Sequence, residues 1–142
     1  MTEFKVYRKE LTYRTGRLIE FVDITRDVEN IVRESGIIRG LVNVFVPHAT
    51  AAILANENEY GLLNDFTELI RELFRPGGSW MHNRIDNNAH AHLAAGFIGA
   101  DKTFPVENGR LVRGTWQNIF LVELDGPRSM RRVIVTVSGE AY

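Results

Sequence analysis

The second half of the chain constrains the fold most, because after Gly99 it consists of short apolar stretches separated by turn residues. These stretches read KTFPV, RLVRG, WQNIFLVEL and RRVIVTVSG, and their composition is typical of β-strands. Glu107-Asn108-Gly109 predicts a hairpin turn, and Asp125-Gly126-Pro127 predicts a second turn. Strands joined by tight turns pair antiparallel, so this half predicts a mainly antiparallel sheet.

The first half adds further strand patterns. Residues 3–13 alternate between polar and apolar side chains, and residues 17–24 follow after the turn sequence TGR, so we expect these two strands to form a hairpin. The stretch GLVNVFVP, residues 40–47, is almost continuously apolar and predicts a central strand buried on both faces. Residues 50–57 continue as a strand or enter a loop.

Three segments have helical patterns. The first runs from Thr25, as the capping residue, to about Ser35 and ends at Gly36. Residues 58–74 carry an apolar face and stop before Pro76-Gly77-Gly78, and residues 88–98 form a short helix that begins at Asn87 or Asn88. The order of elements predicts one α+β domain over residues 1–142, an antiparallel sheet or sandwich with two to three helices.

Composition excludes several classes of protein. The chain has 142 residues, which suffices for a buried core. Its net charge of −1 produces no overall electrostatic attraction to nucleic acid or to a membrane surface. It has no cysteine, so disulfides, thiolate nucleophiles and sulfur-based zinc sites are excluded. No signal-peptide core and no apolar run near the ~20 residues of a membrane span occur, so we expect a cytoplasmic protein.

The four histidines are the first candidates for chemistry. His48 follows a predicted buried strand, and His82 lies in a glycine-rich stretch. In a helix His90 and His92 point about 200° apart, whereas Asn88 and His92 share one face. We therefore expect His92 to face inward and His90 to be an accessory or surface group, although in a strand both would share a face. Three neutral imidazoles can bind a divalent metal ion and leave one coordination position open for water or substrate. The alternative is that the histidines have a structural role in the core, with their hydrogen bonds made within the chain.

Charged residues near the predicted strand ends are the second group of candidates. Glu57 follows the small-residue run ATAAILAN and either points toward a site or is a solvated residue at a helix start. Glu123 interrupts an apolar strand, so it needs a partner such as an arginine or a metal ion. Arg128, Arg131 and Arg132 suit an anion such as phosphate, or they lie at a solvated hairpin end.

Several segments together resemble the YjbQ family: FVPHATAAILANENE (45–59), Asp65, NNAHAHLAAGFIG (87–99), ENGRL, GTWQ and ELDGPR. The similarity covers nearly the whole chain in the same order. It implies an α+β subunit that assembles as a homotrimer, with a pocket of polar residues near the subunit contacts. Members often carry Asp where this chain has His90, and some are named secondary thiamine-phosphate synthase.

The resemblance, added to the residues above, implies a complete site. A divalent ion such as zinc or magnesium would bind His48, His82 and His92. The substrate would contact Asn88, Thr115, Gln117 and Arg128, and the catalytic residues would be Glu57, Asp65 and Glu123. We expect Arg128, His92 and Thr115 to face one cavity.

Two functions fit this site. The first is a metal-assisted enzyme that acts on a phosphorylated small molecule, including the joining of an aminopyrimidine diphosphate to a thiazole phosphate with release of pyrophosphate. The alternative is a non-catalytic trimer that holds a metal ion or a metabolite. Neither requires nucleic acid or a membrane as a partner.

Overall fold

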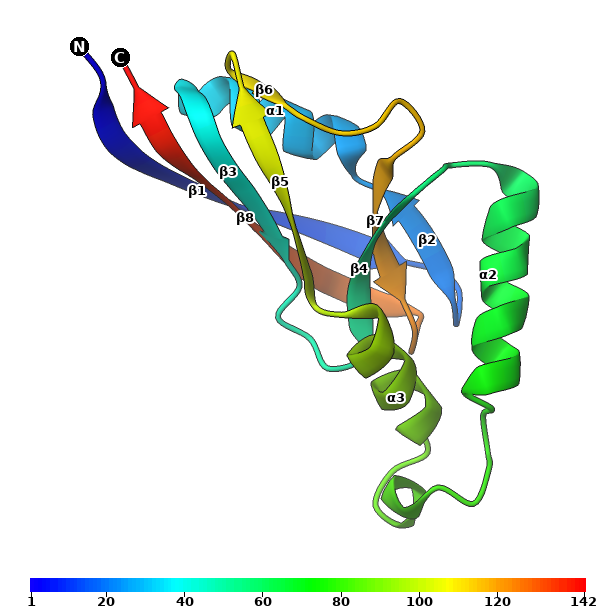
Figure 1. Ribbon diagram of the computed structural model, residues 1–142. Helices are drawn as coiled ribbons and strands as arrows, with labels where there is room; N and C mark the ends of the chain where they lie inside the picture. The colour runs from blue at the N-terminus through cyan, green and yellow to red at the C-terminus, as the bar shows by residue number, and fades with distance from the viewer.

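Two antiparallel sheets and three helices make up the structure, a computed structural model that describes residues 1–142 (Figure 1). The large sheet has the order β1-β8-β3-β5-β6, and the small sheet has the order β2-β7-β4. The strands are β1 (Glu3–Thr15), β2 (Glu20–Asp23), β3 (Ile37–Phe45), β4 (Ala51–Asn56), β5 (Asp101–Glu107), β6 (Arg110–Leu111), β7 (Asn118–Glu123) and β8 (Arg128–Ala141). The expected α+β class with a mainly antiparallel sheet is confirmed.

The helices follow the expected segments. They are α1 (Thr25–Ser35), α2 (Tyr60–Leu73) and α3 (Ala89–Ile98), and a 3-10 turn, η1 (Met81–Arg84), precedes α3. Asp23, rather than Thr25, supplies the side-chain oxygen at the start of α1, since its Oδ1 accepts from the Thr25 amide at 3.0 Å. Gly36 ends α1 with a left-handed φ of 72°. No helix is both long enough and apolar enough to cross a membrane.

Two apolar clusters lie on opposite faces of the small sheet. The larger cluster fills the space between the two sheets and α1, with Val44 from β3 and Leu121 from β7 among its members. The smaller cluster joins the other face of the small sheet to α2 and α3 through Phe120, Ile70 and Ala94. Strands β4 and β7 are therefore buried on both faces.

The prediction that residues 40–47 are buried on both faces is wrong. Strand β3 alternates, and Leu41 keeps 52% of its surface exposed while Val42 is fully buried. The register places Leu41 beside Ser138 of β8 and Pro105 of β5, on the outer face of the large sheet. No layer of this chain covers that face, so an apolar residue there remains open to solvent.

The expected hairpin between residues 3–13 and 17–24 is also wrong. Strand β1 pairs with β8, and β2 pairs with β7 in the other sheet, so the chain crosses between the sheets after Thr15. The turn from β7 to β8 crosses back beside it, and the Gly126 amide donates to Leu18 O at 3.0 Å. A Cβ on Gly126 would lie 2.0 Å from Arg17 O, so only glycine permits this close approach.

Candidate functional site

Two histidines meet where η1 leads into α3. The imidazole rings of His82 and His92 pack edge to face with their centroids 4.7 Å apart. Asn88 lies one helical turn before His92, and its Oδ1 is 3.2 Å from His82 Nε2. The expected sharing of a face by Asn88 and His92 is therefore confirmed, and both residues contact His82.

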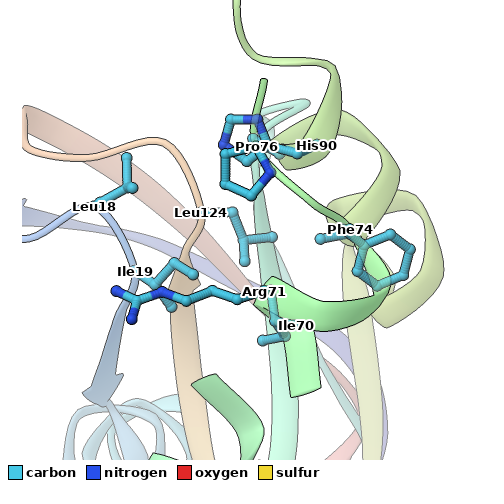
Figure 2. Close-up of a pocket in the computed structure, with 10 residues that line it drawn as sticks. Leu18, Ile19, Ile70, Arg71, Phe74, Pro76, His90 and Leu124 are labelled. Atoms are coloured by element: carbon cyan, nitrogen blue, oxygen red, sulfur yellow. The ribbon is translucent and has the colours of Figure 1, made fainter. Parts of the chain in front are cut away.

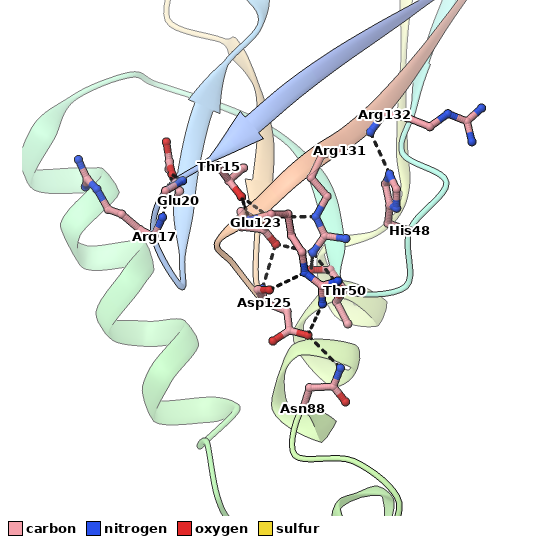
Figure 3. Close-up of polar contacts among 12 residues, drawn as sticks. Thr15, Arg17, Glu20, His48, Thr50, Asn88, Glu123, Asp125, Arg131 and Arg132 are labelled. Carbon is pink, nitrogen blue, oxygen red and sulfur yellow. Dashed lines mark hydrogen bonds and ion pairs between the residues drawn. The ribbon is translucent and has the colours of Figure 1, made fainter.

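A chain of polar contacts links these histidines to the turn between β7 and β8. Asn88 Nδ2 donates to Asp125 Oδ2 at 2.9 Å (Figure 3), and Arg128 Nη2 donates to the same oxygen at 2.9 Å. Arg128 Nε also donates to the Asp125 carbonyl at 2.9 Å. We call His82, His92, Asn88, Asp125 and Arg128 the histidine cluster.

This chain of contacts fixes the state of the His82 ring. A carboxylate only accepts hydrogen bonds, so Asn88 presents its NH₂ group to Asp125 and its oxygen to His82. His82 Nε2 must then carry a proton to donate to Asn88. In the neutral ring this leaves a lone pair on His82 Nδ1, the arrangement in which an imidazole binds a metal ion while its other nitrogen donates to a second residue.

A buried ion pair lies behind the cluster. Glu123 is fully buried, and Arg131 pairs with both of its oxygens. Glu123 Oε1 also accepts from Thr15 Oγ1 at 2.6 Å, and Oε2 accepts from the Asp125 amide at 3.0 Å (Figure 3). Burial raises the pKa of Glu123, but the hydrogen bonds from Arg131 and Thr15 outweigh it and hold the pKa below its usual value.

The partner predicted for Glu123 is therefore Arg131. With both carboxylate oxygens engaged and no exposed surface, Glu123 has no face that a ligand can reach. The catalytic role expected for Glu123 does not fit this geometry. Its contact with the Asp125 amide instead holds the turn between β7 and β8 that carries Asp125.

His48 lies at a separate position. Its Nε2 accepts from the Arg132 amide at 2.9 Å (Figure 3). Burial, followed by the nearby charges of Arg131 and Arg132, lowers the pKa of His48, so the ring is neutral and its Nε2 lone pair is occupied. In residues 1–142 no three His, Cys, Asp or Glu side chains lie close enough to hold a metal ion. One chain thus supplies two neighbouring imidazoles, and the three-histidine metal site stays a prediction.

His90, expected to be an accessory or surface group, is half-buried. Both of its ring nitrogens are buried and have no hydrogen-bond partner. Its ring lines an apolar pocket with Leu124 and Phe74 (Figure 2), on a different side of α3 from the contact between His82 and His92. The helical separation of His90 from His92 is confirmed, but the buried surroundings of His90 were not predicted.

Other expected site residues lie at the opposite end of β7. Thr115 and Gln117 are exposed and precede β7, whereas Asp125 and Arg128 follow it. Gln117 Oε1 accepts from the Gly114 amide at 2.7 Å and so holds the local turn. The six residues of β7 span about 20 Å, so Arg128, His92 and Thr115 do not share one cavity within a chain.

The two other acidic candidates are also separate from the histidines. Asp65 is exposed on α2. Glu57 is half-buried between β4 and α2, beside Asn58, whose Nδ2 donates to Asp23 Oδ2 at 2.7 Å. Glu57 therefore belongs with the end of the molecule that holds Gln117.

A polar pocket at this second end was missed by the sequence reading. It is lined by Asp23, Thr25, Arg26, Glu29, Arg113 and Asn118. Burial raises the pKa of Asp23, but hydrogen bonds from Thr25, Asn118 and Asn58 outweigh it and lower the pKa. In the sequence, only the spacing Asp23-x-Thr25 at the start of a predicted helix pointed to this pocket. An acidic side chain at a helix start accepts hydrogen bonds from the first backbone amides and is therefore held in place there.

The fold and the histidine cluster define a class of protein: a small β-rich domain with two adjacent imidazoles and an arginine where the start of α3 meets the turn between β7 and β8. The chain belongs to the YjbQ family, since the family model described as UPF0047 protein YjbQ-like matches residues 9–140. A UPF0047 protein of Methanothermobacter thermautotrophicus is 47% identical over 96% of this chain and 94% of its own.

Solved structures of relatives have the same fold. A YjbQ-like protein of Sulfolobus solfataricus is 56% identical with a TM-score of 0.95, over 96% of this chain and 99% of that one. A protein of Aeropyrum pernix is 46% identical with a TM-score of 0.89, over 92% and 97% of the two chains. The expected family is therefore shown.

Proposed function

We propose that the histidine cluster is the site of a metal-assisted enzyme that acts on a phosphorylated small molecule. The observation that supports this most is the contact between His82 and His92, with His82 held in one ring state by Asn88 and Asp125. Two imidazoles of fixed orientation beside an arginine are suited to a cation and a phosphate group together.

His82 and His92 would hold a divalent ion such as zinc or magnesium. The bound ion would neutralise charge on the phosphate and on a leaving diphosphate. Asp125 orients Arg128 by two hydrogen bonds, so its guanidinium is directed before a ligand arrives. The Arg128 side chain is 46% exposed, which leaves it accessible to a phosphate oxygen.

We further propose that the complete site forms between chains of a homotrimer. Arg128 and Gln117 lie at opposite ends of β7, so they can contact one ligand only if they come from different subunits. The exposed apolar residues Val6 and Leu41 on the outer face of the large sheet support assembly, because such a surface is suited to burial against another copy.

The test is binding and turnover with a panel of phosphate esters that includes an aminopyrimidine diphosphate and a thiazole phosphate. Arg128→Ala should weaken binding ~10- to 100-fold, because a charge-assisted bond to phosphate contributes about 1.5–3 kcal/mol. Arg39→Ala is the matched control, since Arg39 is also exposed and pairs with a carboxylate, Glu107 at 3.6 Å. Equal affinities of the two variants for every ester would refute the phosphate site.

A second candidate is a non-catalytic trimer that holds a metal ion or metabolite. It is favoured by the state of the two carboxylates at the end of β7. Glu123 and Asp125 are both engaged by arginine, so neither is free to transfer a proton once the histidines hold the metal ion. Tight binding of a phosphate ester without turnover, on protein that carries a stoichiometric metal ion, would support this candidate over the enzyme.

A further inference from the structure

The ring of His90 has unmet hydrogen-bonding capacity. Both nitrogens are buried and neither has a partner within the chain. The walls around them are mostly apolar, with Leu18 before β2, Phe74 after α2 and Leu124 after β7 among them (Figure 2). An imidazole always carries at least one N–H donor, and leaving it unpaired away from water costs free energy. A polar atom from outside the chain is expected at this position.

The pocket at His90 is the narrow end of a longer groove. Its cavity volume is about 10 Å³, and it shares Leu18, Ile19 and Arg71 with a wider pocket of about 420 Å³ between β2 and α2. A cavity of about 10–15 Å³ holds one water-sized group, so the narrow end admits a single hydroxyl, and the wider pocket has room for the rest of a small molecule.

Charge in the groove favours a monoanion. Arg17 and Arg71 line the wider pocket, and neither guanidinium forms an ion pair within the chain. Glu20 is the one acidic residue of this lining, and its Oε1 already accepts from the amides of Gly16 and Arg17. Two positive charges against one negative charge leave a net charge that a single carboxylate balances.

We propose that this groove binds a hydroxy acid: a carboxylate, a small apolar body and a terminal hydroxyl. Arg71 and Arg17 pair with the carboxylate in the wide part, and Leu18, Ile19 and Phe21 contact the apolar body. The hydroxyl enters the narrow end and hydrogen-bonds the ring of His90. The groove shares no residue with the histidine cluster, so this site is separate from the proposed phosphate site.

The test compares 4-hydroxyphenylacetate with phenylacetate by calorimetry on the whole protein. The wild type should bind the hydroxylated acid about 3- to 10-fold more tightly, the effect of one net hydrogen bond. His90→Leu should remove this preference and keep the affinity for phenylacetate. Arg71→Ala should weaken both acids about tenfold, whereas Arg39→Ala and Arg128→Ala should change neither.

A second measurement covers the case in which His90→Leu does not fold. In ¹⁵N NMR spectra of wild-type imidazoles, the hydroxylated acid should shift the His90 ring nitrogens and phenylacetate should leave them almost unchanged. Equal affinities for the two acids, or no shift at His90 with either, would overturn the proposal and indicate a site for water alone. Loss of phosphate-ester binding in Arg128→Ala would leave it unaffected.

Discussion

Asn88 Nδ2 donates to Asp125 Oδ2 at 2.9 Å, although the two residues are 37 positions apart in the chain. This contact joins the start of α3 to the turn between β7 and β8. Asn88 is 8% exposed and also contacts His82, so a single amide sets the relation between the histidines and Arg128. The position of the cluster therefore depends on one buried side chain from a helix start.

Replacing Asn88 should release His82. In Asn88→Ala the His82 ring loses its fixed donor state, so both neutral ring forms should be populated in ¹⁵N NMR spectra. Metal affinity should fall about 10- to 100-fold, the usual effect of removing a residue that orients a metal-binding histidine. Asn43→Ala, which removes an exposed amide bonded to Asp101 and Thr103, is the control and should change neither quantity.

The buried pair of Glu123 and Arg131 should dominate stability. Glu123→Gln leaves the Arg131 charge unpaired in the core, so the free energy of unfolding should fall by about 3–5 kcal/mol in denaturant titrations. The control is Glu10→Gln, which breaks the exposed surface pair with Arg132 and should leave the unfolding free energy almost unchanged, because solvent and salt screen such a pair. Similar losses in the two variants would contradict the role of burial.

The same pair predicts a dependence on pH. The folded-state pKa of Glu123 lies below its usual value of 4.5, so the unfolded chain binds more protons in the window between the two values. Stability from Glu123 is fully present above about pH 4.5 and is lost as the pH falls through the folded-state pKa. The melting temperatures of the wild type and Glu123→Gln should therefore converge as the pH is lowered below 4.5.

Two glycines near the crossing between the sheets should respond differently to alanine. A Cβ at position 126 would lie 2.0 Å from the carbonyl oxygen of Arg17, so Gly126→Ala should destabilise the fold by about 1–3 kcal/mol or more. A Cβ at position 16 has nothing within 4 Å, so Gly16→Ala should leave the unfolding free energy within about 1 kcal/mol of the wild type. Thermal melts of both variants test this contrast.

A homotrimer should be visible in solution and in mixed assemblies. Light scattering after size exclusion should give three times 16.2 kDa, and a monomer at micromolar concentration would contradict it. If Arg128 and Gln117 of neighbouring subunits share a ligand, Arg128→Ala and Gln117→Ala should each lose phosphate-ester binding. Trimers reassembled from both variants should regain it, because each mixed trimer contains one interface with both native residues.

The sequence alone determined the elements whose signals are local. The apolar repeat of α1 and its end at Gly36 depend on contacts within a few residues, and so does the turn that joins β5 to β6. The opposite directions of His90 and His92 also follow from helix geometry alone. The need of Glu123 for a charged partner was predictable for the same kind of reason, since an isolated charge in an apolar strand is unfavourable.

Only the tertiary structure decided which distant segments meet. The patterns of residues 3–13 and 17–24 fit a hairpin, but β1 and β2 pair with β8 and β7, and such long-range pairing leaves no mark within either strand. The burial of the His90 ring nitrogens results from α2 and α3 packing against the small sheet. The separation of Thr115 from Arg128 results from the length of β7 between them. The spacing of residues along the chain predicts which side chains are neighbours within one helix or strand. A site assembled from several elements depends on how those elements pack, which the spacing does not predict.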